Sequence, residues 1–203
     1  MSEEVNKTLM EICSVELVGC SAATQSGSDK LDWHSYIPVY EHVLAPIRHS
    51  AENVLEIGIQ GGGSIVLWER YFSKARVVGV DITGDGVLTS RTKELLGDRS
   101  TLLWNTDAYT GGALQTLSTQ APGGFDLIVD DGPHTIESQV YCAAQYPSLL
   151  KNGGLLIIED IDGMPNAQRI MKSLPSSVNG RIVDLRPQEG RYDDIMVIAQ
   201  KQV

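Results

Sequence analysis

Residues 125–134, which read FDLIVDDGPH, decide the fold. The apolar residues of 125–129 form a run that is too short for a helix and typical of a strand buried in a parallel sheet. The run stops on Asp130 and Asp131, which a Gly-Pro turn and His134 follow. Ligands bind beyond the carboxyl ends of the strands in an open α/β sheet, so we expect these acids to face a crevice. The alternative is that the two aspartates only start a turn and cap the next helix.

The length and the charge of the chain limit the classes of function. Its 203 residues suit one domain, and 16 basic against 26 acidic residues give a formal charge of -10. Such a charge repels phosphate backbones and anionic membranes, so neither nucleic acid nor a membrane is an expected partner. The three cysteines lack metal-ligand spacing, and the chain has no signal-peptide pattern and no run of about 20 apolar residues. These features predict a cytoplasmic protein.

Strand and helix patterns alternate along the chain from residue 53 onward. The predicted strands are 54–57, 76–82, 100–104, 125–129, 155–160, 181–185 and 194–200. Only a short turn joins the last two strands, so they must be antiparallel, because a parallel crossover needs about a dozen residues or more. The sequence therefore predicts an α/β fold with a Rossmann-like, seven-stranded and mostly parallel sheet, an antiparallel last strand and helices on both faces.

The segment before the first strand has a different character. Apolar residues at three- and four-residue steps predict an amphipathic helix over 3–18. The small polar residues of 21–28 predict a mobile loop, which is either a lid hinge or a plain linker. A further helix is expected from Pro38, since proline is tolerated in a first helical turn. Lys30 and Tyr36 precede that helix and would have no core to fill.

Glycines and acids mark the carboxyl ends of the predicted strands. Three consecutive glycines at 61–63 let the backbone approach a ligand, and the helix after them directs free N–H groups at it. Asp81 ends the second strand, where an acid binds ribose hydroxyls. Asp107 follows the third strand and is placed either for an adenine amino group or to cap a helix over 108–117. A second acid pair, 159–160, ends the fifth strand, so both pairs should converge on one crevice.

These motifs resemble those of the class I S-adenosylmethionine-dependent methyltransferases. The residues that carry the likeness are 56–64 (EIGIQGGGS), Asp81, Asp107 and the Gly153-Gly154 turn. Gln60 stands where the commonest form of the glycine loop has glycine. The form present here resembles a narrower branch, the metal-dependent O-methyltransferases of macrolide and related antibiotic sugars, with cephamycin and macrocin relatives.

Other stretches support the same branch. Ser28-Asp29-Lys30, His34-Ser35-Tyr36 and Tyr40-Glu41 resemble a signature before the first strand, whereas 130–134 and 158–160 resemble metal and base motifs. The likeness runs from about Ser28 to the C-terminus, which predicts an N-terminal helix and mobile loop over 1–27 and a methyltransferase domain over 28–203.

The resemblance implies S-adenosylmethionine as the cofactor and assigns residues to it. The glycine loop would pass the methionine part of the cofactor, Asp81 would bind its ribose and Asp107 its adenine. Lys30, Tyr36 and Glu41 would close over it as a lid, and Asp130 would meet the methionine amine or a backbone turn. The predicted cofactor-binding residues are Lys30, Tyr36, Glu56, Gly58, Gly62, Ser64, Asp81, Asp107 and Asp130.

A divalent cation and a base would complete the reaction. Carboxylates are the ligands of Mg²⁺ or another hard divalent cation, and we assign Asp131, Glu159 and Asp160 to it. The cation would lower the pKa of the acceptor hydroxyl. His134 would remove the hydroxyl proton, which makes His134 and Asp131 the predicted catalytic residues. The alternative is that His134 is an ordinary histidine at a helix start.

The acceptor and the rival functions follow from the same acids. A small molecule with two neighbouring oxygens, such as a sugar diol or a catechol, would chelate one cation, and natural-product biosynthesis is the expected setting. The rivals are a nicotinamide-dependent oxidoreductase, whose G-x-G-x-x-G turn is broken here by Gln60, and a non-catalytic cofactor-binding scaffold. A homo-oligomer is possible on this interpretation.

Overall fold

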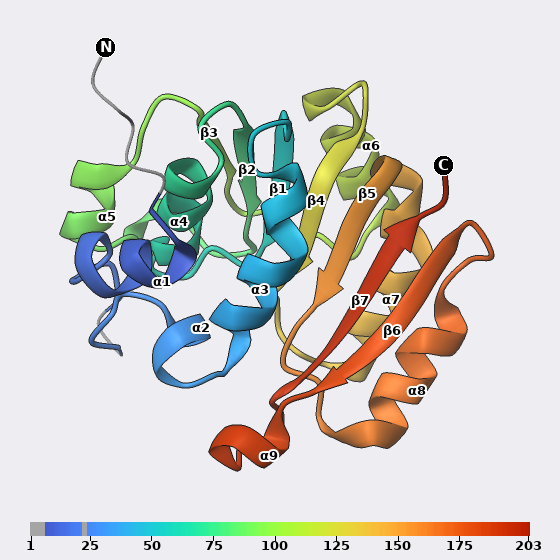
Figure 1. Cartoon of the computed structure of the whole chain (residues 1–203). Coiled ribbons are helices and arrows are strands. Elements are labelled where there is room, and N and C mark those ends of the chain that lie inside the picture. Colours follow the sequence, from blue (N-terminus) through green and yellow to red (C-terminus); the bar gives the residue numbers. More distant parts are fainter. Residues whose placement is uncertain (1–6, 22–23) are drawn as a thin grey trace.

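A computed structural model describes residues 7–21 and 24–203 of the chain. Within those residues one seven-stranded sheet forms the centre, in the order β3-β2-β1-β4-β5-β7-β6 (Figure 1). The strands are β1 (Asn53–Ile57), β2 (Arg76–Val80), β3 (Ser100–Leu103), β4 (Phe125–Asp130), β5 (Leu150–Ile158), β6 (Val178–Asp184) and β7 (Ile195–Lys201). The strand order reverses between β1 and β4, and ligands of doubly wound sheets bind at such a switch point.

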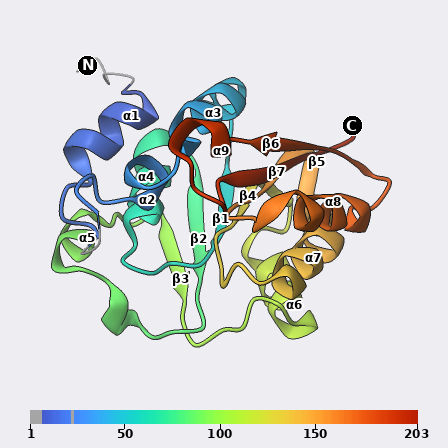
Figure 2. The same cartoon turned by 90° about the horizontal axis from the view of Figure 1, so that it is seen from below.

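Helices cover both faces of the sheet, as Figure 2 shows from below. The helices are α1 (Leu9–Glu11), α2 (Asp29–Asp32), α3 (Tyr36–Leu44), α4 (Gly63–Tyr71), α5 (Ser90–Leu95), α6 (Gly111–Gln120), α7 (Ile136–Gln145), α8 (Gly163–Ser173) and α9 (Arg186–Glu189). One core cluster joins α1, α3 and α4 to one sheet face, and the other joins α6, α7 and α8 to the opposite face. Successive residues of β1, Val54 and Leu55, enter different clusters, as expected of a strand buried on both sides.

The predicted fold class is confirmed, including the antiparallel end of the sheet. β1 to β5 pair in parallel, whereas β7 is antiparallel to both β5 and β6. β6 begins at Val178, three residues before the predicted start, because Val178 still pairs with Lys201. No helix within the described residues is long and apolar enough to cross a bilayer.

Several predicted helix boundaries were wrong, and local chemistry explains the shifts. The helix expected from residue 108 begins at Gly111, because the Thr110 side chain accepts from the Ala113 N–H and caps it. Asp107 therefore does not cap this helix. The helix expected to reach 150 ends at Gln145 and continues as a 3₁₀ turn that contains Pro147, which has no N–H to donate.

The N-terminal predictions are only partly within the described residues. Residues 3–6 of the expected helix lie outside them, and Thr8 caps α1 by a reciprocal pair of contacts with Glu11. A π-helical stretch, Ile12–Glu16, follows directly. Residues 22–23 of the expected mobile loop also lie outside the described residues, whereas Ser26 and Ser28 are buried.

Candidate active site

Strand register places the predicted site residues at one edge of the sheet. Ile57 on β1 is level with Asp130 on β4, and Asp130 is level with Ile158 on β5. The residues that follow these three, Gly58, Asp131 and Glu159, therefore leave the sheet side by side. The Asp131 N–H donates to the Ile57 carbonyl at 2.9 Å, and the Glu159 N–H donates to the Asp130 carbonyl at 3.1 Å. These bonds extend the parallel ladder by one residue into the site.

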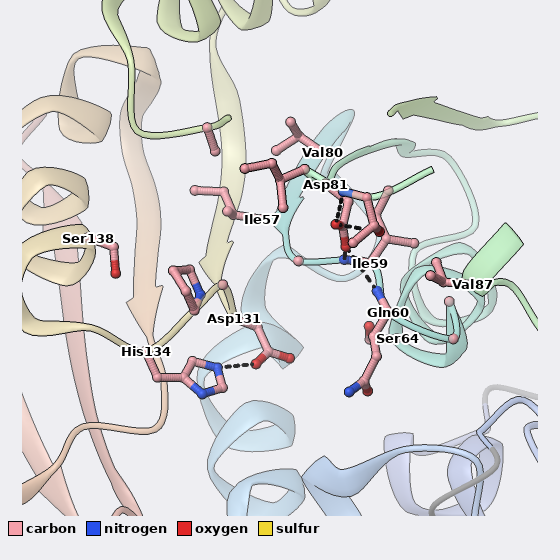
Figure 3. Close-up of a pocket in the computed structure, with 18 of the residues that line it drawn as sticks. Ile57, Ile59, Gln60, Ser64, Val80, Asp81, Val87, Asp131, His134 and Ser138 are labelled. Atoms are coloured by element: carbon pink, nitrogen blue, oxygen red, sulfur yellow. Dashed lines mark hydrogen bonds and ion pairs between the residues drawn. The ribbon is translucent and has the colours of Figure 1, made fainter. Parts of the chain in front are cut away.

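Asp81 fixes the glycine loop from the end of β2. Its Oδ2 accepts the N–H groups of Ile59 at 2.8 Å and Gln60 at 3.2 Å, as the dashed lines in Figure 3 show. Its Oδ1 accepts both the N–H and the hydroxyl of Thr83. Burial alone would raise the pKa of Asp81, but these hydrogen bonds lower it. The carboxylate is therefore ionised and oriented before any ligand arrives.

The loop approaches the β4 end so closely that a side chain would not fit. A Cβ on Gly58, whose φ is +91°, would lie 2.0 Å from the Asp131 carbonyl oxygen. Gln60 has a φ of +45°, a left-handed conformation that glycine adopts more easily. Gln60 therefore has a conformation that suits the glycine of the loop form described above.

We expect the change Gly58→Ala to lower the free energy of unfolding by about 1–3 kcal/mol, because the chain must both strain and move away from Asp131. The Gly153→Ala variant is the matched control, since Gly153 has a φ of +80° but nothing within 4 Å of an added Cβ. Urea denaturation measures the free energy of unfolding of both variants. The loss in Gly153→Ala reports backbone strain alone, and the additional loss in Gly58→Ala reports the clash with Asp131. Equal losses in the two variants would contradict the close approach.

A cavity of about 800 Å³ runs from the glycine loop and Asp81 to the Asp131–His134 turn. Of the predicted cofactor-binding residues, those that line the cavity are Gly58, Gly62, Ser64, Asp81 and Asp107. The others do not line it; they are Lys30, Tyr36, Glu56 and Asp130. Asp107 is exposed and its Oδ1 accepts the N–H of Tyr109 at 2.9 Å. The exposed apolar Ile82 and Val87 line the same cavity as Asp81.

Asp130 and Asp131 point to different surroundings. The Asp130 carboxylate is 2% exposed, and its Oδ1 accepts the Tyr109 hydroxyl at 2.5 Å. Burial raises the pKa of Asp130 to about 6. Asp131 instead faces the cavity, where its Oδ1 lies 3.0 Å from Nε2 of His134 (Figure 3). The sequence predicted different roles for the two acids, with the methionine amine or a backbone turn as the partner of Asp130. In this structure the side-chain partner of Asp130 is Tyr109.

Three side chains converge at the Asp131–His134 end of the cavity, which Asp131 and His134 line and Asp160 does not. Ligand atoms of Asp131, His134 and Asp160 all lie within 4.8 Å of one another, and Nδ1 of His134 is 3.4 Å from Oδ2 of Asp160. Burial would lower the pKa of His134, but the hydrogen bond to Asp131 and the charges of the carboxylates raise it to about 8. The neighbouring carboxylates thus stabilise the protonated form of His134.

Lys30 is the functional-site residue whose position the sequence did not indicate. Its ammonium nitrogen is 2.6 Å from Asp131 Oδ2, 2.5 Å from Glu159 Oε2 and 3.5 Å from Glu56 Oε1. Burial would lower its pKa, but these carboxylates raise it well above the ordinary value. Lys30 therefore lies among the acids behind the cavity. Glu41, expected in the same lid, instead accepts the Leu9 N–H and the Tyr71 hydroxyl, away from the cavity.

The donor set fits a divalent cation. Glu56, Asp131 and Glu159 are three acids around the one ammonium of Lys30, and Asp160 lies beside His134. Burial raises the pKa values of Glu159 and Glu56, that of Glu56 to about 7. Oε1 of Glu159 is buried without a hydrogen-bond partner. Oxygen ligands with excess negative charge are what Mg²⁺ prefers. Glu159 is not in the converging group, because its Oε2 is directed at Lys30.

The sheet order, the antiparallel β7 and a glycine loop between β1 and α4 define the Rossmann-like fold of methyltransferases. Solved structures agree. The MycE methyltransferase from the mycinamycin pathway, in complex with Mg, SAH and mycinamycin VI, matches with a TM-score of 0.65 and 21% identity over 92% of this chain and 53% of that chain. The SAH complex of a Bacillus cereus O-methyltransferase matches with a TM-score of 0.62 and 20% identity over 79% of this chain and 78% of that one.

Curated relatives are more similar in sequence. The 8-demethyl-8-(2-methoxy-alpha-L-rhamnosyl)-tetracenomycin-C 3'-O-methyltransferase of Streptomyces olivaceus is 34% identical over 148 residues, 68% of this chain and 35% of the relative. The L-olivosyl-oleandolide 3-O-methyltransferase of Streptomyces antibioticus is 32% identical over 135 residues, 63% of this chain and 32% of the relative. The chain thus spans about a third of the length of these relatives. No profile of a known protein family matches it.

These matches confirm the predicted resemblance to class I S-adenosylmethionine-dependent methyltransferases and to their antibiotic-sugar O-methyltransferase branch.

Proposed function

We propose that the chain is an S-adenosylmethionine-dependent O-methyltransferase that methylates a sugar hydroxyl of a small molecule with the help of a divalent cation. The observation that carries the proposal is the cavity that joins Asp81 and the glycine loop to the cluster of Asp131, His134 and Asp160. Relatives named as sugar O-methyltransferases support the substrate class. The cytoplasmic location and any homo-oligomer stay predictions from the sequence.

The chain's own groups define the course of the reaction. Asp81 would hold the ribose of the donor, and the glycine loop would face its methionine part, which carries the sulfonium methyl group. The acceptor oxygen attacks that methyl carbon, the carbon–sulfur bond breaks, and S-adenosylhomocysteine leaves. The hydroxyl proton passes to the neutral form of His134, whose share increases as the pH rises toward its pKa of about 8. Asp131 and Asp160 would hold the cation, and Glu159, which contacts Lys30, would add negative charge near it. The cation would act as a Lewis acid and lower the pKa of the acceptor hydroxyl.

A vicinal diol suits this arrangement as the acceptor, because two neighbouring oxygens chelate one cation. A sugar without the second hydroxyl is therefore expected to be methylated more slowly. Equal kcat/KM for the diol and for its deoxy analogue would remove the diol from the proposal.

Binding of S-adenosylhomocysteine tests the cofactor assignment. We expect the Asp81→Asn variant to bind it about 10- to 100-fold more weakly, because the amide replaces a charged acceptor of several hydrogen bonds. Calorimetry measures this change, and Asp98→Asn at an exposed acid is the control. If titration with NADH gave a binding heat and titration with S-adenosylhomocysteine gave none, the oxidoreductase would be favoured instead.

Methyl transfer from labelled S-adenosylmethionine tests the cation. The rate is expected to fall to background in EDTA and to return with Mg²⁺. Identical rates in EDTA and Mg²⁺ would show that the carboxylates do not serve a metal.

A further inference from the structure

Asp160 holds an unusual backbone conformation at the centre of the carboxylate cluster. It follows the buried end of β5, is 8% exposed and has a φ of +53°. This is the left-handed region, which a residue with a side chain keeps only when its surroundings hold it there. In this conformation its Oδ2 lies 3.4 Å from Nδ1 of His134.

Tyr36 contacts Asp160 twice through one hydroxyl group. The hydroxyl donates to Asp160 Oδ1 at 2.7 Å and accepts the Asp160 N–H at 3.2 Å. Tyr36 is 1% exposed, so neither bond competes with bulk water. The hydroxyl thus fixes both the main chain and one carboxylate oxygen, which leaves Oδ2 directed at the cluster.

His34 and Asp194 hold the Tyr36 ring in place. The His34 and Tyr36 rings are stacked, with centroids 4.6 Å apart and planes 16° apart. Nδ1 of His34 lies 3.4 Å from Oδ1 of the fully buried Asp194, and its Nε2 lies 3.5 Å from Asp160 Oδ1. Asp194, in the segment before β7, therefore positions the His34 ring on which Tyr36 stacks.

Gln139 contacts the same backbone from the opposite side. It lies on α7, is 2% exposed and does not line the cavity. Its side-chain amide donates to the carbonyls of Glu159 at 2.9 Å and Asp160 at 3.2 Å. An amide has two N–H donors, and both are used here on consecutive residues. A buried carbonyl left without its donor is costly, so this pair of bonds stabilises the turn.

We propose that Tyr36 and Gln139 are positioning residues that hold Asp160 in its left-handed conformation, so that its Oδ2 meets Asp131 and His134 in a preformed cation site. The inference rests on the proposed metal-dependent function. Tyr36 acts on the N–H and Oδ1 of Asp160, and Gln139 acts on its carbonyl, so the residue is held at every polar group except the oxygen that faces the cluster. This assignment replaces a lid role for Tyr36.

Metal affinity separates this role from a general contribution to folding. Mn²⁺ accepts the same oxygen ligands as Mg²⁺ and is detected directly by electron paramagnetic resonance. We expect Tyr36→Phe and Gln139→Met each to raise the Kd for Mn²⁺ about 10- to 100-fold, as changes next to metal ligands do. The Kd for S-adenosylhomocysteine should change less than about threefold, because the glycine loop and Asp81 lie outside these contacts.

Matched controls remove comparable groups elsewhere. Gln145→Met changes an exposed glutamine on the same helix, and Tyr71→Phe removes a hydroxyl that bonds Glu41 away from the cavity. Both should keep the wild-type Kd for Mn²⁺, even where Tyr71→Phe lowers the melting temperature. Gln139→Glu should weaken Mn²⁺ binding more than Gln139→Met. The introduced carboxylate would have no N–H to donate and would face the carbonyl oxygens of Glu159 and Asp160.

The outcomes distinguish the inference from the function on which it rests. Wild-type protein that binds no Mn²⁺ would overturn both. Wild-type binding with unchanged affinity in Tyr36→Phe and Gln139→Met would overturn the positioning role alone. A parallel loss of Mn²⁺ and S-adenosylhomocysteine binding in these variants would also overturn it, because that pattern marks general unfolding of the site.

Discussion

Replacing Lys30 with methionine is expected to lower the free energy of unfolding by about 3–5 kcal/mol, the cost of leaving buried charges without their partner. Lys30 is 1% exposed, and its ammonium group lies within 3.5 Å of carboxylates of Glu56, Asp131 and Glu159. Methionine replaces the aliphatic stem and much of its packing, lacks only the terminal nitrogen in length, and removes the charge. Urea denaturation in EDTA measures the loss.

Divalent cations should restore part of this stability. A cation among the same carboxylates supplies positive charge that the variant lacks, and binding to the native state alone stabilises it by mass action. Saturating Mg²⁺ is therefore expected to raise the melting temperature of Lys30→Met more than that of the wild type. An equal rise in both proteins would show that Lys30 and the cation serve separate groups of acids.

Lys151 provides the matched control. It also contacts two acids, Glu52 at 2.7 Å and Asp126 at 3.1 Å, but the Glu52 side chain is 72% exposed. Pairs of this kind contribute about 0–1 kcal/mol in water. A loss in Lys151→Met as large as that in Lys30→Met would contradict the importance of burial at Lys30.

The sheet could be predicted because each of its strands carries a local signal. Short apolar runs that stop on acids or glycines identify buried parallel strands and their carboxyl ends together, as at 125–131. The short connection before β7 excluded a parallel last pair without any tertiary information. Helix ends were less predictable, because the competition between Thr110 and Asp107 as the cap depends on the path of the loop.

The contacts of Lys30 with the acids of the carboxylate cluster could not be predicted in the same way, since they join distant parts of the chain. Lys30 lies 101 residues before Asp131 and 129 before Glu159, and no local pattern links them. The signal available in the sequence was that Lys30 had no apolar core to pack into. In the structure Lys30 lies instead among the carboxylates of Glu56, Asp131 and Glu159. Gln139 did carry a signal, because it shares a buried helix face with Cys142, Ala143 and Tyr146. A polar residue in such a stripe needs buried partners, and here they are the carbonyls behind the cluster.

His134→Asn is expected to lower kcat about 10²–10⁴-fold, which is the range for loss of a general base. His134 has a φ of +53°, and asparagine is among the few residues that adopt this conformation readily, so the turn after β4 should persist. The imidazole is the group that accepts the proton, whereas the neutral amide of asparagine is a very weak base. Single-turnover methyl transfer to the acceptor of the wild type measures the effect on chemistry.

Binding measurements decide whether that loss is catalytic. The Kd for S-adenosylhomocysteine should stay within about threefold, since His134 lies at the opposite end of the cavity from Asp81. His49→Asn, at an exposed histidine outside the cavity, should leave both quantities unchanged. Mn²⁺ affinity distinguishes the two chemical roles that the geometry allows, because His134 lies next to both Asp131 and Asp160. A fall in kcat with unchanged Mn²⁺ binding identifies the base, whereas a fall that saturating Mn²⁺ reverses would make His134 a metal ligand and leave the proton to another acceptor.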